Sequence, residues 1–131
     1  MPHVEVRFFE DEHGHVPVLE WLTKLRLHDR RAYVECRARL RLLGQFGHEL
    51  RRPHCDYLRD GVYELRIRIR RSQLRILYFF HGRSAVVLTN AFSKENRVSK
   101  IDIARSLARK RVFEASPQER TYEGRWDDVS N

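Results

Sequence analysis

The sequence predicts an α+β fold built around an antiparallel sheet. Between residues 61 and 94 the chain holds three consecutive runs of β-branched and aromatic residues joined by short polar links, which is typical of strands connected by hairpins. Apolar residues recur at helical spacing both before and after this region. We therefore expect an N-terminal strand, a helical hairpin, a three-strand meander and a C-terminal helix, in that order.

The first strand of the meander alternates strictly between apolar and charged residues. This is the period of a half-buried strand, and it gives one face three arginines. The apolar positions are Tyr63, Leu65, Ile67 and Ile69, and the charged ones are Glu64, Arg66, Arg68 and Arg70. Guanidinium groups match phosphate oxygens, and a cluster of them without matching carboxylates repels itself until an anion binds. This face therefore predicts polyanion binding, and a solvated outer sheet face is the alternative.

Hairpin parity decides which residues of the next two strands share this face. If the first link is a loop of two or four residues around Arg71 and Ser72, Arg68 lies opposite Arg75 and Arg66 opposite Leu77. The same count across the second link places Arg75 opposite Asn90. A three-residue loop would exchange the faces. The set expected on one face is Arg66, Arg68, Arg75, Asn90 and, at the end of its strand, Lys94.

Two helices are predicted between the N-terminal strand and the meander. Alternation of apolar and charged residues predicts a strand over residues 3–9. Pro17 suits the first turn of the first helix. Asp29 is a suitable N-cap for the second helix, which is expected to end at Gly44 and Gly47. The basic segment that follows has no assigned structure.

The C-terminal part of the chain divides into a helix and a tail. Ser99 and Asp102 resemble a capping box, which predicts a third helix beginning there. From residue 114 onward acidic and loop-forming residues take over, which indicates little structure. We therefore expect one domain over residues 1–113 and an acidic tail over residues 114–131. Two aromatic residues are candidates to anchor this tail: Tyr122 and Trp126.

Composition limits the classes of function. The 131 residues include 26 Lys and Arg against 18 Asp and Glu, a net charge of +8, which favours nucleic acid, the ribosome or an acidic protein as partner. Two cysteines do not make a disulfide framework. No run approaches the roughly 20 apolar residues that a membrane span needs. We expect a cytoplasmic protein with reduced thiols and no membrane partner.

Three motifs in the meander resemble those of a known toxin family. They are Tyr63-Glu64-Leu65-Arg66, Leu74-Arg75-Ile76-Leu77-Tyr78-Phe79-Phe80 and Asn90-Ala91-Phe92-Ser93-Lys94. With the predicted order of elements, they make the chain similar to the HigB branch of the RelE/ParE toxin superfamily, the phage-derived HigB-like family, over roughly residues 4–113. The resemblance implies a RelE-like fold. It also implies a type II toxin–antitoxin toxin, neutralised by an antitoxin protein, that cleaves messenger RNA in the ribosomal A site without metal or cofactor.

The resemblance also implies catalytic roles for Arg66, Arg75 and Lys94. RNA is cut by its own 2′-hydroxyl if a protein removes that proton, stabilises the phosphorane and protonates the leaving oxygen. Arginine is not deprotonated in proteins, so the arginines are expected to clamp phosphate and stabilise the transition state. Neighbouring cations favour the neutral amine of Lys94, which makes it the candidate proton carrier. Glu64 is the rival base, or an ion-pair partner that orients the arginines.

Further residues are candidates for binding RNA, and a second class of function stays open. The predicted RNA-binding set is Arg68, Arg70, Asn90, Arg97 and Phe79, of which the last would stack a nucleobase. Relatives usually have a histidine at the position of Asn90 and a lysine at the position of Glu95. The alternative function is therefore a non-catalytic module that binds nucleic acid or protein, such as a ParE-like target binder or a phage-derived inhibitor.

Overall fold

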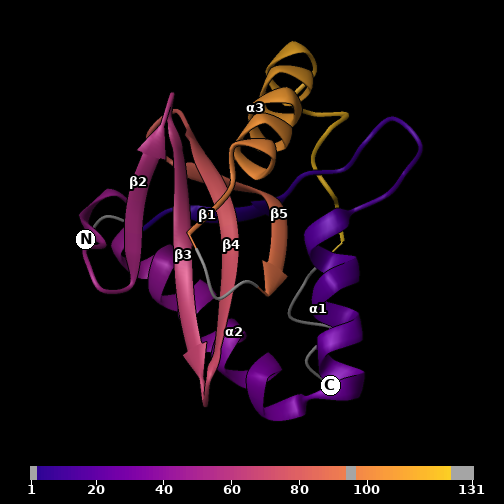
Figure 1. Cartoon of the computed structure of the whole chain (residues 1–131). Helices are drawn as coiled ribbons and strands as arrows, with labels where there is room; N and C mark the ends of the chain where they lie inside the picture. The colour runs from indigo at the N-terminus through magenta and orange to yellow at the C-terminus, as the bar shows by residue number, and fades with distance from the viewer. Residues whose placement is uncertain (1–2, 94–96, 125–131) are drawn as a thin grey trace.

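The computed structural model describes residues 3–93 and 97–124, and it has the predicted α+β architecture. One five-stranded sheet, in the order β1-β5-β4-β3-β2, lies between helices on both faces (Figure 1). Helices α1 and α2 pack on one face, and α3 packs on the other. The elements are β1 (Glu5–Phe8), α1 (Pro17–His28), α2 (Arg30–Phe46), η1 (Gly47–Glu49), β2 (Cys55–Arg59), β3 (Val62–Ile69), β4 (Ser72–His81), β5 (Ala85–Ser93) and α3 (Lys100–Ala115).

The β3–β4 hairpin turns one residue earlier than the sequence predicts. Ile69 pairs with Ser72, so the turn consists of residues 70 and 71, and Arg70 takes a left-handed φ of 53°. As a result Arg66, not Arg68, lies opposite Arg75. The predicted pairing was wrong by two residues. The predicted face was right, because a shift of two residues leaves every side chain on its own face.

The β4–β5 hairpin contains two irregularities that cancel. His81 pairs with Ala85 across a three-residue loop, which exchanges the faces near the turn. The register then shifts at Thr89, and the extra residue exchanges the faces back, so Leu77 lies opposite Asn90. The predicted pairing of Arg75 with Asn90 was therefore wrong. Asn90 nevertheless lies on the face that carries Arg66 and Arg75.

Two edge strands complete the sheet. The basic segment without an assigned structure forms β2, which pairs antiparallel with β3. Its turn, Asp60-Gly61, has φ values of 52° and 87°, as two-residue hairpin turns require. At the other edge β1 runs parallel to β5, so the sheet is not purely antiparallel as predicted. The strand β2 matters for the site, because it brings an acidic side chain beside the arginines of β3.

The predicted helix starts are confirmed, and one predicted helix end was wrong. Asp29 caps α2 by accepting a hydrogen bond from the backbone N–H of Ala32, and Ser99 and Asp102 form the capping box of α3. Gly44 does not end α2, which continues to Phe46. Apolar residues of both helices of the hairpin, among them Leu22 and Leu40, pack against the sheet. None of the helices in the described residues is long and apolar enough to cross a membrane.

Replacing Asp29 with alanine is expected to destabilise the protein in a pH-dependent way. The N–H of Ala32, and then the guanidinium of Arg70, lower the pKa of Asp29 below its ordinary value of 3.8. A carboxylate with a lowered pKa stabilises the fold above that ordinary value, and the stabilisation is lost as pH falls through the folded pKa. Urea denaturation followed by circular dichroism should show a difference from the wild type at neutral pH that shrinks in acid. A difference that does not change with pH would contradict this assignment, and Asp29→Asn, which keeps an acceptor without the charge, is the control.

The segment after α3 belongs to the packed fold, contrary to the predicted tail. Helix α3 continues to Ala115, and the backbone N–H of Tyr122 donates to the carbonyl of Phe8 at 2.9 Å. The Tyr122 ring packs edge-on against the Phe8 ring, so the predicted anchoring by Tyr122 is confirmed. Trp126, the other predicted anchor, lies outside the described residues. Residues 116–124 therefore lie along the edge of the sheet at β1, away from the arginines of β3.

Candidate functional site

A buried carboxylate joins two arginines on the face of the sheet that α3 partly covers. Glu64 and Arg66 are on β3, and Arg75 lies directly opposite Arg66 on β4. Nη1 of Arg75 donates to Oε1 of Glu64, and Nη2 of Arg66 lies 3.4 Å from Oε2 of the same carboxylate. The Glu64 and Arg75 side chains are only 4 and 9% exposed, whereas Arg66 is 35% exposed. Glu64 therefore fixes both guanidinium groups, and Arg66 is the one that meets solvent.

A second carboxylate reaches Arg66 from the edge strand. Oδ2 of Asp56 lies 3.2 Å from Nη2 of Arg66, and its Oδ1 lies 3.0 Å from Nη2 of Arg52. The described charges thus alternate in sign from the edge of the sheet inward, in the order Arg52, Asp56, Arg66, Glu64 and Arg75. We call these five residues the charge chain. The expected ion pairing of the arginines with Glu64 is confirmed, whereas Asp56 was missed because β2 was not predicted beside β3.

Helix α3 covers only one half of this face. Its apolar side packs on Val62 and Leu77, and Phe113 packs on Phe79. The half nearer the β3–β4 turn carries the charge chain together with Arg68, which is exposed and pairs with Gln73. The site is therefore a polar half-face of the sheet bounded by α3 on one side and by the edge strand β2 on the other.

One predicted RNA-binding residue pairs with the helical hairpin, and another is buried. Arg70 is in the β3–β4 turn, and its Nη1 is 3.1 Å from Oδ2 of Asp29 at the start of α2, so it binds to the helical hairpin. Phe79 is fully buried, with its ring edge-on to Phe113 at a centroid distance of 5.5 Å. It cannot stack a nucleobase. The stacking role of Phe79 was wrong, because α3 covers the end of β4 that carries it. Arg70 lies in the turn and stays exposed, so its binding to RNA remains a prediction.

Asn90 has a structural role in the described chain. Its side-chain Nδ2 donates to the carbonyl of Asp102 at 3.2 Å, and its Oδ1 accepts from the hydroxyl of Thr89 at 2.6 Å. Thr89, at the register shift of β5, also contacts the Ser106 hydroxyl at 2.6 Å. This buried network attaches α3 to β5, so Asn90 positions the helix, and its side-chain amide already donates and accepts hydrogen bonds within the protein.

The other predicted site residues are exposed or undescribed. Arg97 is exposed just before α3. Lys94, the predicted proton carrier, lies outside the described residues, immediately after the end of β5 at Ser93. The structure therefore brings Arg66, Arg68 and Arg75 together on one face, as predicted. It adds Asp56 and Arg52, which sequence reasoning missed and which the Asp60-Gly61 turn signal would have placed beside them.

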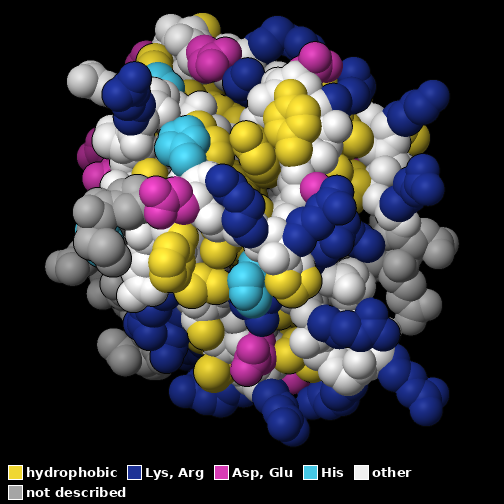
Figure 2. Space-filling view, turned by 90° about the vertical axis from the view of Figure 1, so that its left-hand side faces the viewer, with side chains coloured by type: hydrophobic (Ala, Val, Ile, Leu, Met, Phe, Trp, Pro, Cys, Tyr) yellow, Lys and Arg dark blue, Asp and Glu magenta, His cyan; other side chains and the backbone are white. Residues whose placement is uncertain are grey.

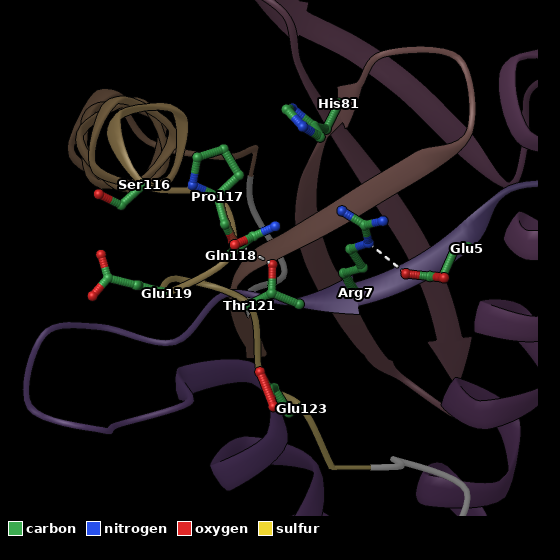
Figure 3. Close-up of a pocket in the computed structure, with 9 residues that line it drawn as sticks. All are labelled: Glu5, Arg7, His81, Ser116, Pro117, Gln118, Glu119, Thr121 and Glu123. Carbon is green, nitrogen blue, oxygen red and sulfur yellow. Dashed lines mark hydrogen bonds and ion pairs between the residues drawn. The ribbon is translucent and has the colours of Figure 1, made fainter.

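A hollow elsewhere on the surface is separate from this site. It has a volume of about 960 Å³ and lies between β1 and the segment after α3 (Figure 3). In Figure 3 Glu5 and Arg7 lie on β1 and bind each other, and Glu119 and Glu123 lie on the opposite wall. These groups are mostly acidic, and they lie at the edge of the sheet opposite β2. The hollow therefore does not extend the charge chain.

The cysteines and possible metal ligands add no second site. Cys36 and Cys55 are both free and buried, and burial raises the pKa of the Cys36 thiol to about 12. A thiol with so high a pKa is a poor nucleophile. Among residues 3–93 and 97–124, no three His, Cys, Asp or Glu side chains gather closely enough to hold a metal ion.

Fold and site together define a small α+β protein with paired arginines on an open half of its sheet. Residues 20–112, from α1 into α3, match the family described as "Phage derived protein Gp49-like (DUF891)". The chain belongs to this phage-derived family, which is related to the RelE-like proteins of toxin–antitoxin systems. No curated protein matches the chain. The matched range contains every residue of the charge chain.

Proposed function

We propose that this protein is the toxin of a type II toxin–antitoxin system and acts as a ribosome-dependent mRNA endonuclease of the HigB-like branch. The observation that carries the proposal is the pair Arg66 and Arg75, which lie opposite each other on one face and share the carboxylate of Glu64. Two guanidinium groups fixed side by side match the oxygens of one phosphodiester. Membership of a family related to toxin–antitoxin proteins supports the same conclusion and implies an antitoxin as partner.

The proposed mechanism divides the chemistry among the residues by their surroundings. Arg66, partly exposed, binds the scissile phosphate, and Arg75 stabilises the charge that develops on the phosphorane. Both oxygens of Glu64 face guanidinium groups, which favours an orienting role over proton transfer. The proton carrier is then Lys94, which follows β5 directly in the sequence. Arg68 and Arg97, both exposed, bind flanking phosphates of the RNA strand.

Expression of the protein in bacteria without an antitoxin should stop growth and block incorporation of labelled amino acids. Arg75→Ala and Lys94→Ala are each expected to restore protein synthesis, because one removes a group that stabilises the transition state and the other removes the proton carrier. The measurement is pulse labelling after induction, with immunoblots showing that every variant accumulates. Toxicity that persists in both variants, or that never appears when the wild-type protein is expressed, would contradict the proposed nuclease activity.

One observation favours a non-catalytic alternative. The described arginines of the charge chain all contact carboxylates, as they would in a network that only shapes a surface. A module of this kind would bind RNA or a protein target without cutting RNA, as proposed for ParE-like binders on the same scaffold. If this alternative holds, messenger RNA stays intact in cells that accumulate the wild-type protein, and Lys94→Ala has the same effect on growth as the wild type.

A further inference from the structure

Asp56 is bound in the way that a phosphate would be. Its Oδ1 lies 3.0 Å from Nη2 of Arg52, and its Oδ2 lies 3.2 Å from Nη2 of Arg66. Oδ1 also accepts the backbone N–H of Tyr57 at 3.0 Å. Arg52 also contacts Oδ2, at 3.2 Å, so the carboxylate lies between two guanidinium groups, as a phosphodiester does when two arginines hold it.

The surroundings of Asp56 allow its carboxylate to be replaced. Exposure rises toward the edge of the sheet, from 9% for the side chain of Arg75 to 35% for Arg66 and 75% for Arg52. The side chain of Asp56 itself is 23% exposed and lies on the edge strand β2. Figure 2 views the side of the molecule on which β2 lies, and Lys and Arg side chains are spread over this side with acidic side chains between them. An incoming strand of RNA therefore meets Arg52 and Asp56 before it meets the buried end of the charge chain.

We propose that the RNA site continues across β3 onto β2, where Asp56 occupies the place of a backbone phosphate until RNA binds. This inference rests on the proposed function. When RNA arrives, the carboxylate of Asp56 turns away and a phosphodiester takes its place between Arg52, Arg66 and the N–H of Tyr57. The exchange replaces one anion by another, so both arginines keep a charged partner. The Arg52–Asp56 pair is exposed, and exposed ion pairs contribute little to stability. Displacing Asp56 from Arg52 therefore costs little once a neighbouring phosphate of the same RNA strand is held at Arg66 and Arg75.

The role of Asp56 is tested by its amide variant against a matched control. The probe is a short fluorescent single-stranded RNA with 2′-O-methyl groups, which binds but has no 2′-hydroxyl to attack, and binding is followed by fluorescence anisotropy. Asp56→Asn is expected to lower Kd several-fold, because it frees Arg52 and Arg66 for phosphate. Asp60→Asn makes the same change of net charge at the β2–β3 turn, where Asp60 contacts Arg59, and keeps a residue type that tolerates the φ of 52°. Equal gains in affinity for the two variants would overturn the inference.

The role of Arg52 is tested by the salt dependence of binding. Arg52→Ala is expected to reduce the slope of log Kd against log salt by about 0.7 to 1, the contribution of one phosphate contact. Arg59→Ala removes an arginine at the end of β2 that is paired with Asp60 at 3.0 Å and lies off the charge chain. It should leave the slope unchanged. Equal slopes for the two variants would also overturn the inference.

Arg66→Ala separates failure of this inference from failure of the proposed function. If the wild type binds the probe and Arg66→Ala weakens binding, RNA binding by the sheet face stands, and the Asp56 and Arg52 variants then decide the extension onto β2. If the wild type and Arg66→Ala bind the probe equally, the sheet face is not an RNA site. In that case both the proposed function and its extension fail.

Discussion

Glu64→Ala is expected to lower the free energy of unfolding by about 3–5 kcal/mol, the usual cost of removing one partner of a buried ion pair. The carboxylate of Glu64 is 4% exposed and contacts the guanidinium groups of Arg75 and Arg66. Its removal withdraws a charged acceptor from the interior of the sheet, where water does not replace it readily. The measurement is urea denaturation at neutral pH, followed by circular dichroism.

Two further variants make this stability result interpretable. Replacing both partners, as Glu64→Leu with Arg75→Met, is expected to restore much of the lost stability, because apolar groups of similar size often replace a buried pair without cost. Glu35→Ala removes an exposed carboxylate of α2 and should change the free energy of unfolding by less than about 0.5 kcal/mol. If Glu64→Ala lowers the free energy of unfolding by no more than Glu35→Ala does, the buried ion pair does not organise the site.

Arg66→Ala is expected to reduce the rate of RNA cleavage by about 10²–10³, the range found when one donor to a transition-state oxyanion is removed. Arg66 is the partly exposed arginine of the cluster, so its removal should cost much less stability than removal of Glu64. The cleavage rate of Arg66→Lys should lie between those of the wild type and Arg66→Ala, because an ammonium group keeps the charge but not the planar fork. The measurement is the rate of disappearance of full-length messenger RNA in a cell-free translation mixture.

Arg59→Ala is the matched control for this rate. Arg59 lies on β2 and pairs with Asp60 at the turn, so its removal changes the net charge equally without touching the charge chain. A drop in rate of the same size for Arg59→Ala and Arg66→Ala would mean that general electrostatic attraction, and not a positioned guanidinium, governs the reaction.

The sequence predicts the sheet well because its signals are local. Strict alternation in β3 fixes which residues face together, and a register error of two residues does not disturb that result. The capping residues Asp29 and Ser99 likewise act on their own helices, and both are confirmed. The register shift at Thr89 has no comparable local signal, and the side chain of Thr89 there contacts Ser106 of α3, which is distant in the sequence. The face of Asn90 was therefore predicted correctly, although two departures from the assumed hairpin had to cancel.

The candidate site is predictable only where a single strand determines it. The side-by-side placement of Arg66 and Arg75 follows from the β3–β4 hairpin alone. The burial of Phe79 depends on how far α3 extends over the sheet, which no local pattern gives. Asp56 was missed because β2 has no clear alternation, so its pairing with β3 was not expected. The compensation of the arginines by carboxylates is thus a property of the tertiary structure.

Mapping the 5′ ends of messenger RNA in a purified translation system tests the central proposal most directly. With the wild-type protein we expect new ends at defined positions within translated codons, and no cleavage when ribosomes are left out. Arg66→Ala and Lys94→Ala should leave the message intact, whereas Arg59→Ala should cut like the wild type. An intact message with the wild-type protein, or cleavage at the same positions and the same rate with Arg66→Ala, would contradict a nuclease site on this face of the sheet.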